Sequence, residues 1–266
     1  VEMKESTDIN TTLCACTTVS ALCFASCAGT YDIKGTSNDS NLEESKIYLT
    51  VLHNNEPKNI DSCEVVHGQF HFDGPVDSVR VAMIGQLPVV LEEGEITVKD
   101  DNTQSSATGT PLNDKLTNFM RKYQQIINQY SELQRRPYQA MMNGEDMNSV
   151  QMEVEKKSNE LNDKMDRLLT GFVTENFDNV LGPWVFLNAC SMRFNGTPMT
   201  DAWVEEIMSR ATPKFKNNPM VKDYYRKAQE NERIMNGTEQ DPNVQAPQLA
   251  PPTPRQMAQP ADSAAR

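Results

Sequence analysis

The chain has 266 residues, of which 38% are hydrophobic, and a formal net charge of −12 at pH 7. This length can hold one large or two small domains, and the polar composition indicates that part of it is not packed core. The negative charge argues against a nucleic-acid partner, because such binding needs Lys and Arg to displace counterions from phosphates. No run reaches the roughly 18 to 20 apolar residues that a membrane-spanning helix needs.

The N-terminal stretch LCACTTVSALCFASCAG concentrates four of the six cysteines. A zinc site is disfavoured there, because Cys14 and Cys16 are too close for the usual C-x(2–4)-C pair and no histidine lies nearby. The apolar run 13–26 has the length of a signal-peptide core, although Lys4 is the only positive charge before it. The motif FASC, ending at Cys27, resembles a bacterial lipobox. We therefore expect residues 1–27 to be a signal peptide with lipidation at Cys27, and a structured N-terminal helix is the alternative.

Lipidation at Cys27 would place the protein in the cell envelope, anchored to a membrane on the periplasmic or outer-membrane side. Cys63 and Cys190 would then remain as the thiols of the processed chain. In an oxidising compartment they either form a disulfide or stay as two separate buried thiols, and both alternatives remain open. No C-x-x-C motif is left, so a thioredoxin-type redox centre is not expected. A metal site and a cofactor are not expected either.

Residues 28–110 show the alternating pattern of short β-strands. In KIYLTVLH (46–53) every second residue is apolar, and CEVVHGQFHFDG predicts a hairpin that turns at His67-Gly68 with Phe70 and Phe72 facing inward. The segment PVVLEEGEITVKD predicts a further turn. Regularly spaced short strands of this kind predict a small antiparallel β-sandwich or open barrel.

Two carboxylates, Glu92 and Glu93, lie at that further turn, before Gly94. A turn of this kind is expected to be solvated, whereas an acid–base pair needs a desolvated cleft. The histidines near the predicted hairpin, His67 and His71, are expected on an exposed turn and an outward strand face rather than in a metal site.

From residue 111 to 237 the apolar residues recur with a helical period. Thr110 can serve as the N-cap of a helix that begins at Pro111 and that Pro137 is expected to end. A second helix follows, with Met147 and Val150 on its apolar stripe. These two helices are expected to pair as an antiparallel hairpin.

Three shorter helices are predicted after the hairpin. One covers the apolar segment GPWVFLNACSM, one begins after a cap at Thr200, and one runs from about Asn218 to Asn236. The expected fold class is thus α+β, with a β-domain (28–110) followed by an all-helical region (111–237). Residues 238–266, rich in Pro, Gln and Ala, are expected to be a disordered tail.

Four motifs in this order, YDIKG, VVHGQFHFDG, LPVVLEEGEITV and ATGTPLNDKLTNFM, resemble a β-domain of unknown function found near the N-terminus of Bacteroidetes lipoproteins. That domain often precedes a thioredoxin- or peroxiredoxin-like domain. The similarity covers about residues 31–119, and the hairpin 68–74, the turn 91–96 and the junction 109–113 carry most of it. It implies no catalytic residues, and the sequence offers no Trp-Cys-x-x-Cys to which a redox role could be transferred. Ser263, within Asp-Ser-Ala, resembles the O-glycosylation acceptor of envelope proteins from the same phylum.

We therefore expect a membrane-anchored envelope lipoprotein that acts as a non-catalytic module and binds an unknown envelope protein or ligand. The alternative is an accessory to extracytoplasmic thiol-redox or peroxide handling, which would act through Cys63 or Cys190 as a redox thiol. An enzyme is not expected, because no phosphate loop, nucleophile elbow or catalytic triad is recognisable. The binding hypothesis predicts an exposed apolar or aromatic patch on the folded protein.

Overall fold

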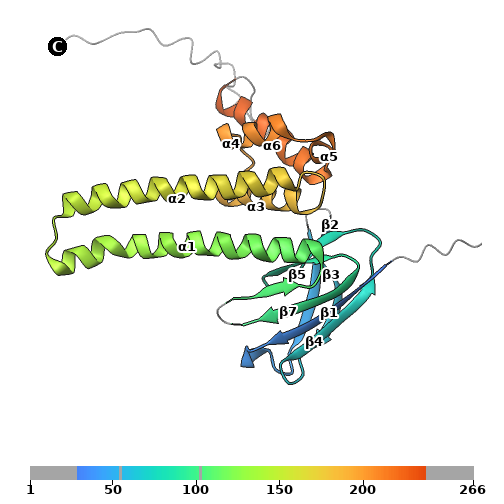
Figure 1. Cartoon of the computed structure of the whole chain (residues 1–266). Helices are drawn as coiled ribbons and strands as arrows, with labels where there is room; N and C mark the ends of the chain where they lie inside the picture. The colour runs from blue at the N-terminus through green and yellow to red at the C-terminus, as the bar shows by residue number, and fades with distance from the viewer. Residues whose placement is uncertain (1–28, 54–55, 102–103, 238–266) are drawn as a thin grey trace, which may run out of the picture.

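The computed structural model describes residues 29–53, 56–101 and 104–237. Within this part, strands come first along the chain and helices follow, so the expected α+β class is confirmed. In Figure 1 the β-domain lies beneath one end of a long helical hairpin, and shorter helices cover the other side of that same end. The opposite end of the hairpin projects away from both. The predictions for Cys27, Ser263 and the tail fall outside the described residues.

The strands form two four-stranded sheets, with the orders β4-β1-β7-β8 and β3-β2-β5-β6. All pairs are antiparallel except β1 with β7, which run parallel. The expected antiparallel sandwich is therefore correct apart from this pair, which arises because the turn at Glu93-Gly94 carries the chain from one sheet to the other. The strands are β1 (Thr30–Ser37), β2 (Lys46–His53), β3 (Glu56–Glu64), β4 (Gln69–Pro75), β5 (Arg80–Ile84), β6 (Leu87–Leu91), β7 (Gly94–Asp100) and β8 (Ser106–Thr108).

The tight turn predicted at His67-Gly68 is present and is closed by an isolated bridge between Val66 and Gln69. The flanking strands β3 and β4 do not pair as the predicted hairpin, because they belong to different sheets. His67 and Gly68 have positive φ, 54° and 69°, which a tight turn of this hand requires. Phe70 and Phe72 are buried between the sheets, as expected. Gly35 lies opposite Phe70 in the β1–β4 pair, and a Cβ at this glycine would come within 2.0 Å of the Phe70 ring. Glycine is therefore needed there to let the ring fill the core.

The two long helices are α1 (Pro111–Asn143) and α2 (Met147–Glu175). Gly144, with φ 70°, ends α1 in the left-handed conformation, and the Asp146 side chain accepts the amide hydrogens of Asn148 and Ser149 to begin α2. The expected hairpin is thus present (Figure 1). A seven-residue spacing links Phe119, Ile126, Leu133 and Ala140, which are all buried, so the two helices meet along a narrow coiled-coil seam.

The prediction that Pro137 ends the first helix is wrong. Proline removes one backbone hydrogen bond, yet α1 continues through it to Asn143. The reason is tertiary. Leu133 and Ala140 are buried on either side of it, and the Arg136 guanidinium lies 2.6 Å from Glu145 and 3.3 Å from Glu153. These contacts with the loop and with α2 hold the turn that the proline weakens.

The remaining helices pack against the ends of α1 and α2 that lie nearest the β-domain. We call this assembly the helical body; its largest fully buried side chains include Leu181, Phe186 and Phe215. Asp201, rather than the predicted Thr200, caps α4, because its carboxylate accepts the Val204 amide hydrogen at 2.9 Å. The three predicted helices are otherwise present, as α3 (Leu181–Arg193), α4 (Ala202–Arg210) and α6 (Pro219–Met235), and a short helix that was not predicted, α5 (Pro213–Lys216), lies between the last two. Within the described residues, no helix combines the length and apolarity needed to cross a membrane.

Candidate functional site

The junction between the β-domain and α1 is built by a carboxylate from the turn between the sheets. The Glu92 Oε1 atom accepts the amide hydrogens of Leu112 at 2.7 Å and Asn113 at 3.1 Å. Thr110 occupies the predicted N-cap position, but its side chain makes no capping hydrogen bond. Glu92 is 9% exposed, so the expectation of a solvated carboxylate is wrong for Glu92, whereas Glu93 is exposed as expected. The charge of Glu92 stabilises the first turn of the helix, where free amide hydrogens and the helix dipole favour an anion.

Asn113 fastens α1 to the edge of the second sheet. Its side-chain amide is fully buried, accepts the Val90 amide hydrogen at 2.9 Å and donates to the Val90 carbonyl at 2.8 Å. On this open edge of β6, the Asn113 side chain therefore makes the two hydrogen bonds to Val90 that a neighbouring strand would otherwise make. Val90 itself packs in the core of the helical body. The β-domain and the helices are thus joined by both hydrogen bonds and apolar contact.

Two glycines with positive φ complete the junction, Gly94 at 126° and Gly109 at 107°. A Cβ at Gly109 would lie 2.6 Å from the Glu95 carbonyl oxygen, so a side chain cannot be accommodated there. The sequence motifs 91–96 and 109–113 therefore meet in space. Their contacts hold α1 against the β-domain.

The two cysteines predicted as a disulfide or as redox thiols are both free in the structure. Cys63 packs beside the β-domain core, whereas Cys190 is fully buried in the helical body. Burial raises the pKa of the Cys190 thiol to about 12, and burial also raises the pKa of Cys63. A thiol with a raised pKa is largely protonated at neutral pH and is a poor nucleophile. Neither cysteine lies in an environment that activates a thiol.

The histidines lie as expected. His67 is almost fully exposed at the turn, and His71 is on the outer face of its sheet with its Nε2 atom 2.7 Å from Asp32. No group of three metal-binding side chains of the His, Cys, Asp or Glu type occurs in the described residues. This part of the chain thus offers no cluster of such ligands for a metal.

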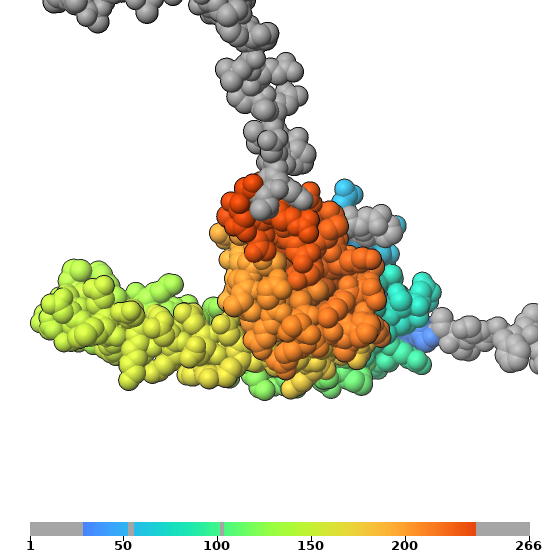
Figure 2. All heavy atoms as spheres, turned by 90° about the horizontal axis from the view of Figure 1, so that it is seen from above, coloured from blue at the N-terminus to red at the C-terminus, as the bar shows by residue number. Residues whose placement is uncertain are grey.

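The end of the hairpin carries a group of exposed apolar side chains. Around the loop that joins α1 and α2, the exposed fractions are 66% for Tyr138, 63% for Met141, 70% for Met142, 39% for Met147 and 65% for Met152. We call these five residues the tip patch. Figure 2 shows this end as a lobe well separated from the rest of the molecule.

The tip patch follows from helix geometry. Tyr138 and Met142 are each two residues from Ala140, and two residues correspond to about 200° around a helix. Because Ala140 faces the seam, the two larger side chains point to solvent. Met152 has the same relation to the buried Val150 on α2. The sequence pattern placed Met147 on the buried stripe, which is wrong because α2 begins there and no neighbouring helix extends far enough to cover it.

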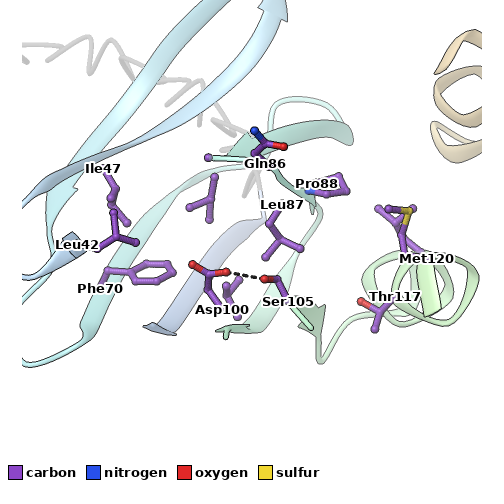
Figure 3. Close-up of a pocket in the computed structure, with 14 residues that line it drawn as sticks. Leu42, Ile47, Phe70, Gln86, Leu87, Pro88, Asp100, Ser105, Thr117 and Met120 are labelled. Atoms are coloured by element: carbon purple, nitrogen blue, oxygen red, sulfur yellow. Dashed lines mark hydrogen bonds between the residues drawn. The ribbon is translucent and has the colours of Figure 1, made fainter. Parts of the chain in front are cut away.

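A second candidate is a pocket at the root of α1, with a volume of about 370 Å³. Figure 3 shows Leu42, Ile47 and Phe70 on one side of this root pocket, Leu87 at its centre and Met120 on the side of α1. The Asp100 carboxylate lies among these apolar groups and accepts a hydrogen bond from the Ser105 hydroxyl at 2.5 Å. Sequence reasoning missed this pocket, since its walls come from five separate segments.

Comparison with known proteins adds one finding. The family model described as a domain of unknown function (DUF4369) matches residues 31–116, which run from β1 into the first turns of α1. No curated protein matches the chain, and no solved structure matches it. The matched segment contains the β-domain and the Glu92–Asn113 junction but ends before the tip patch. The expected similarity to a β-domain of unknown function is therefore confirmed for residues 31–116, while the link to lipoproteins, to Bacteroidetes and to redox domains stays a prediction.

Proposed function

We propose that the protein is a lipid-anchored, non-catalytic interaction module of the cell envelope, which binds a partner protein through the tip patch. The anchor is Cys27, at the end of the FASC motif. The β-domain serves as a base, and the hairpin formed by α1 and α2 serves as an arm. The partner is expected to offer an apolar surface to the methionine and tyrosine side chains.

The observation that carries this proposal is the exposure of the tip patch. Met141, Met142 and Met152 are each more than 60% exposed, although burying such a side chain is worth roughly 2 kcal/mol. Exposed apolar groups concentrated at one end of an element commonly mark interaction sites, and here they lie on both outer faces of the arm, since Met142 points away from α2 and Met152 points away from α1. Methionine suits such a site because its flexible, polarizable side chain adapts to a partner's shape.

The position of the tip patch also supports the proposal. In Figure 1 the start of β1 and the end of the hairpin lie on opposite sides of the molecule. Cys27 is three residues before Thr30, where β1 begins. At about 1.5 Å per residue, the 33 residues of α1 extend about 50 Å. An anchor at Cys27 would therefore hold the tip patch well away from the membrane, where a partner can reach it.

Co-purification of the membrane-anchored protein tests the binding role. Met141, Met142 and Met152 are changed together to Gln, which keeps length and helix propensity but removes the apolar character. The control changes Met192 and Met235 to Gln in the same way. These two methionines are 65% and 70% exposed, and they lie on the helical body. We expect the wild type and the control to recover the same partner and the tip variant to lose it. Equal recovery by all three proteins would refute a role for the tip patch.

Metabolic labelling with a fatty-acid analogue tests the anchor separately. The wild type should incorporate the label, and Cys27→Ala should not. Label that survives this substitution would contradict lipidation at Cys27 and would leave the tip-patch experiment unaffected. The two parts of the proposal can thus fail independently.

A further inference from the structure

The root pocket combines apolar walls with one carboxylate. Phe70, Val98 and Leu116 are buried within it, and the half-buried side chains of Leu42 and Leu87 also face it. Its volume is about 370 Å³. This size is within the range of small-molecule sites in proteins. Burial of an apolar ligand body against apolar walls is favourable, because it removes apolar surface from water.

Asp100 gives the pocket its charge. One carboxylate oxygen accepts the Ser105 hydroxyl at 2.5 Å, and the other accepts the Ser37 hydroxyl at 3.4 Å. These two hydroxyl groups orient the carboxylate but do not neutralise it. Among the described residues, no basic side chain forms an ion pair with Asp100. Each carboxylate oxygen can accept more than one hydrogen bond, so acceptor capacity remains for a ligand.

We propose that the root pocket binds a small aliphatic cation, that is, a molecule with an apolar body and a primary ammonium group. The apolar body lies against Phe70, Leu87 and Leu116, and the ammonium group donates to Asp100. The charge of the pocket selects this class, because an anionic head group would meet an uncompensated carboxylate and a neutral one would form only an ordinary hydrogen bond. This inference does not depend on the tip patch or on the lipid anchor.

Three probes of equal chain length separate the contribution of charge from that of apolar burial. Octylammonium, octanol and octanoate are each titrated into the full chain by calorimetry. We expect octylammonium to bind about tenfold more tightly than octanol, as a charge-assisted hydrogen bond implies, and octanoate to bind most weakly. In Asp100→Asn the preference for octylammonium over octanol should disappear, while octanol binding stays as in the wild type.

A second pair of variants locates the binding. Met120, 36% exposed at the mouth of the pocket, is changed to Trp so that the indole fills the entrance. The control is Met220→Trp, at a position 38% exposed on α6 and outside the pocket. Met120→Trp should weaken octylammonium at least tenfold, and the control should bind as the wild type does. The proposal is overturned if the three probes bind the wild type alike, if none binds, or if Met120→Trp binds octylammonium unchanged.

Discussion

The helical body and the distal arm, which we define as residues 126–161, use the same kinds of side chain in opposite ways. In the helical body, Phe186 stacks on Trp203 with ring centroids 5.8 Å apart and meets Phe215 edge-on at 5.4 Å. In the distal arm, the buried cluster consists of Ile126, Leu133 and Leu161, and nearer the end Ala140 and Val150 are also buried. The tyrosine and the four methionines of the tip patch are exposed. The arm therefore uses few apolar groups for folding and leaves others available for binding.

The largest difference is expected for truncation of a core side chain. Phe186→Ala leaves a cavity in the helical body and should lower the free energy of global unfolding by about 3–5 kcal/mol. Leu133→Ala removes part of a narrow seam and should lower mainly the free energy of local opening of the arm, by about 2 kcal/mol. Urea denaturation measures the first effect, and native-state hydrogen exchange measures the second. Equal global destabilisation by both substitutions would mean that arm and body unfold as one unit.

The junction is the next place to test. Asn113→Ala leaves the buried amide hydrogen of Val90 without its Asn113 partner and removes one of the two hydrogen bonds that the Val90 carbonyl accepts, the other coming from the Glu92 amide. It should cost about 2–4 kcal/mol of global stability. Asn118→Ala is the matched control, because Asn118 is exposed on the same helix. Urea denaturation of the two variants provides the measurement. Substitutions at the surface usually change the free energy of unfolding by about 0.5 kcal/mol or less. If the two variants differ by no more than this, Asn113 does not fasten α1 to the sheet.

Sequence reasoning found the elements whose cause is local. The turn at His67-Gly68 was predictable because the alternation of Phe70 and Phe72 follows directly on a turn pair, but the pairing of β4 with β1 instead of β3 was not. The continuation of α1 through Pro137 was not predictable, because it depends on contacts with α2 and the loop that cannot be read from the sequence around the proline. Glu92 was assigned to solvent for the same reason, since its partners are 20 and 21 residues away and lie in another element.

The candidate sites were less predictable than the fold. Exposure of the tip patch depends on where the two helices of the hairpin end. The prediction for Met147 is wrong because the apolar stripe of α2 includes this residue, although no neighbouring helix covers it. The Asp100–Ser105 pair belongs to the root pocket only through the packing of α1 against the β-domain. The sequence analysis predicts an exposed apolar or aromatic patch, but it does not predict where on the fold this patch lies.

Replacing the proline in α1 should sharpen the contrast between arm and body. Pro137→Ala restores a backbone amide hydrogen that can bond to the Leu133 carbonyl and removes the clash of the proline ring. It should stabilise the distal arm by about 1–3 kcal/mol. Hydrogen exchange should slow between residues 130 and 143 and stay unchanged in the helical body. Faster exchange in the arm would show that the proline is part of a favourable local geometry.

The smallest effect is expected from acid. Hydrogen bonding from Arg136, with Asn143, lowers the pKa of Glu145, and the Lys157 ammonium, with Arg136, lowers the pKa of Glu153. A lowered carboxyl pKa contributes stability above the ordinary value of 4.5, which is lost as the pH falls through the lowered pKa. Amide exchange at the loop 144–146, corrected for its intrinsic pH dependence, should therefore accelerate slightly below pH 4.5. The variant with Glu145→Gln and Glu153→Gln should show a smaller response, and the part that remains belongs to Asp146, whose pKa is lowered by hydrogen bonding from Ser149 and Asn148. An undiminished response in the variant would contradict the assignment to Glu145 and Glu153.

Site-specific photo-crosslinking tests the central claim most directly. A photoreactive amino acid replaces either Met142 at the tip patch or Met235 on the helical body, two positions that are each 70% exposed. We predict that cells expressing the anchored protein yield a discrete adduct from position 142 and none from position 235. That adduct should disappear when Met141 and Met152 are also changed to Gln. No adduct from position 142, or the same adducts from both positions, would contradict the assignment of the hairpin end as the binding surface.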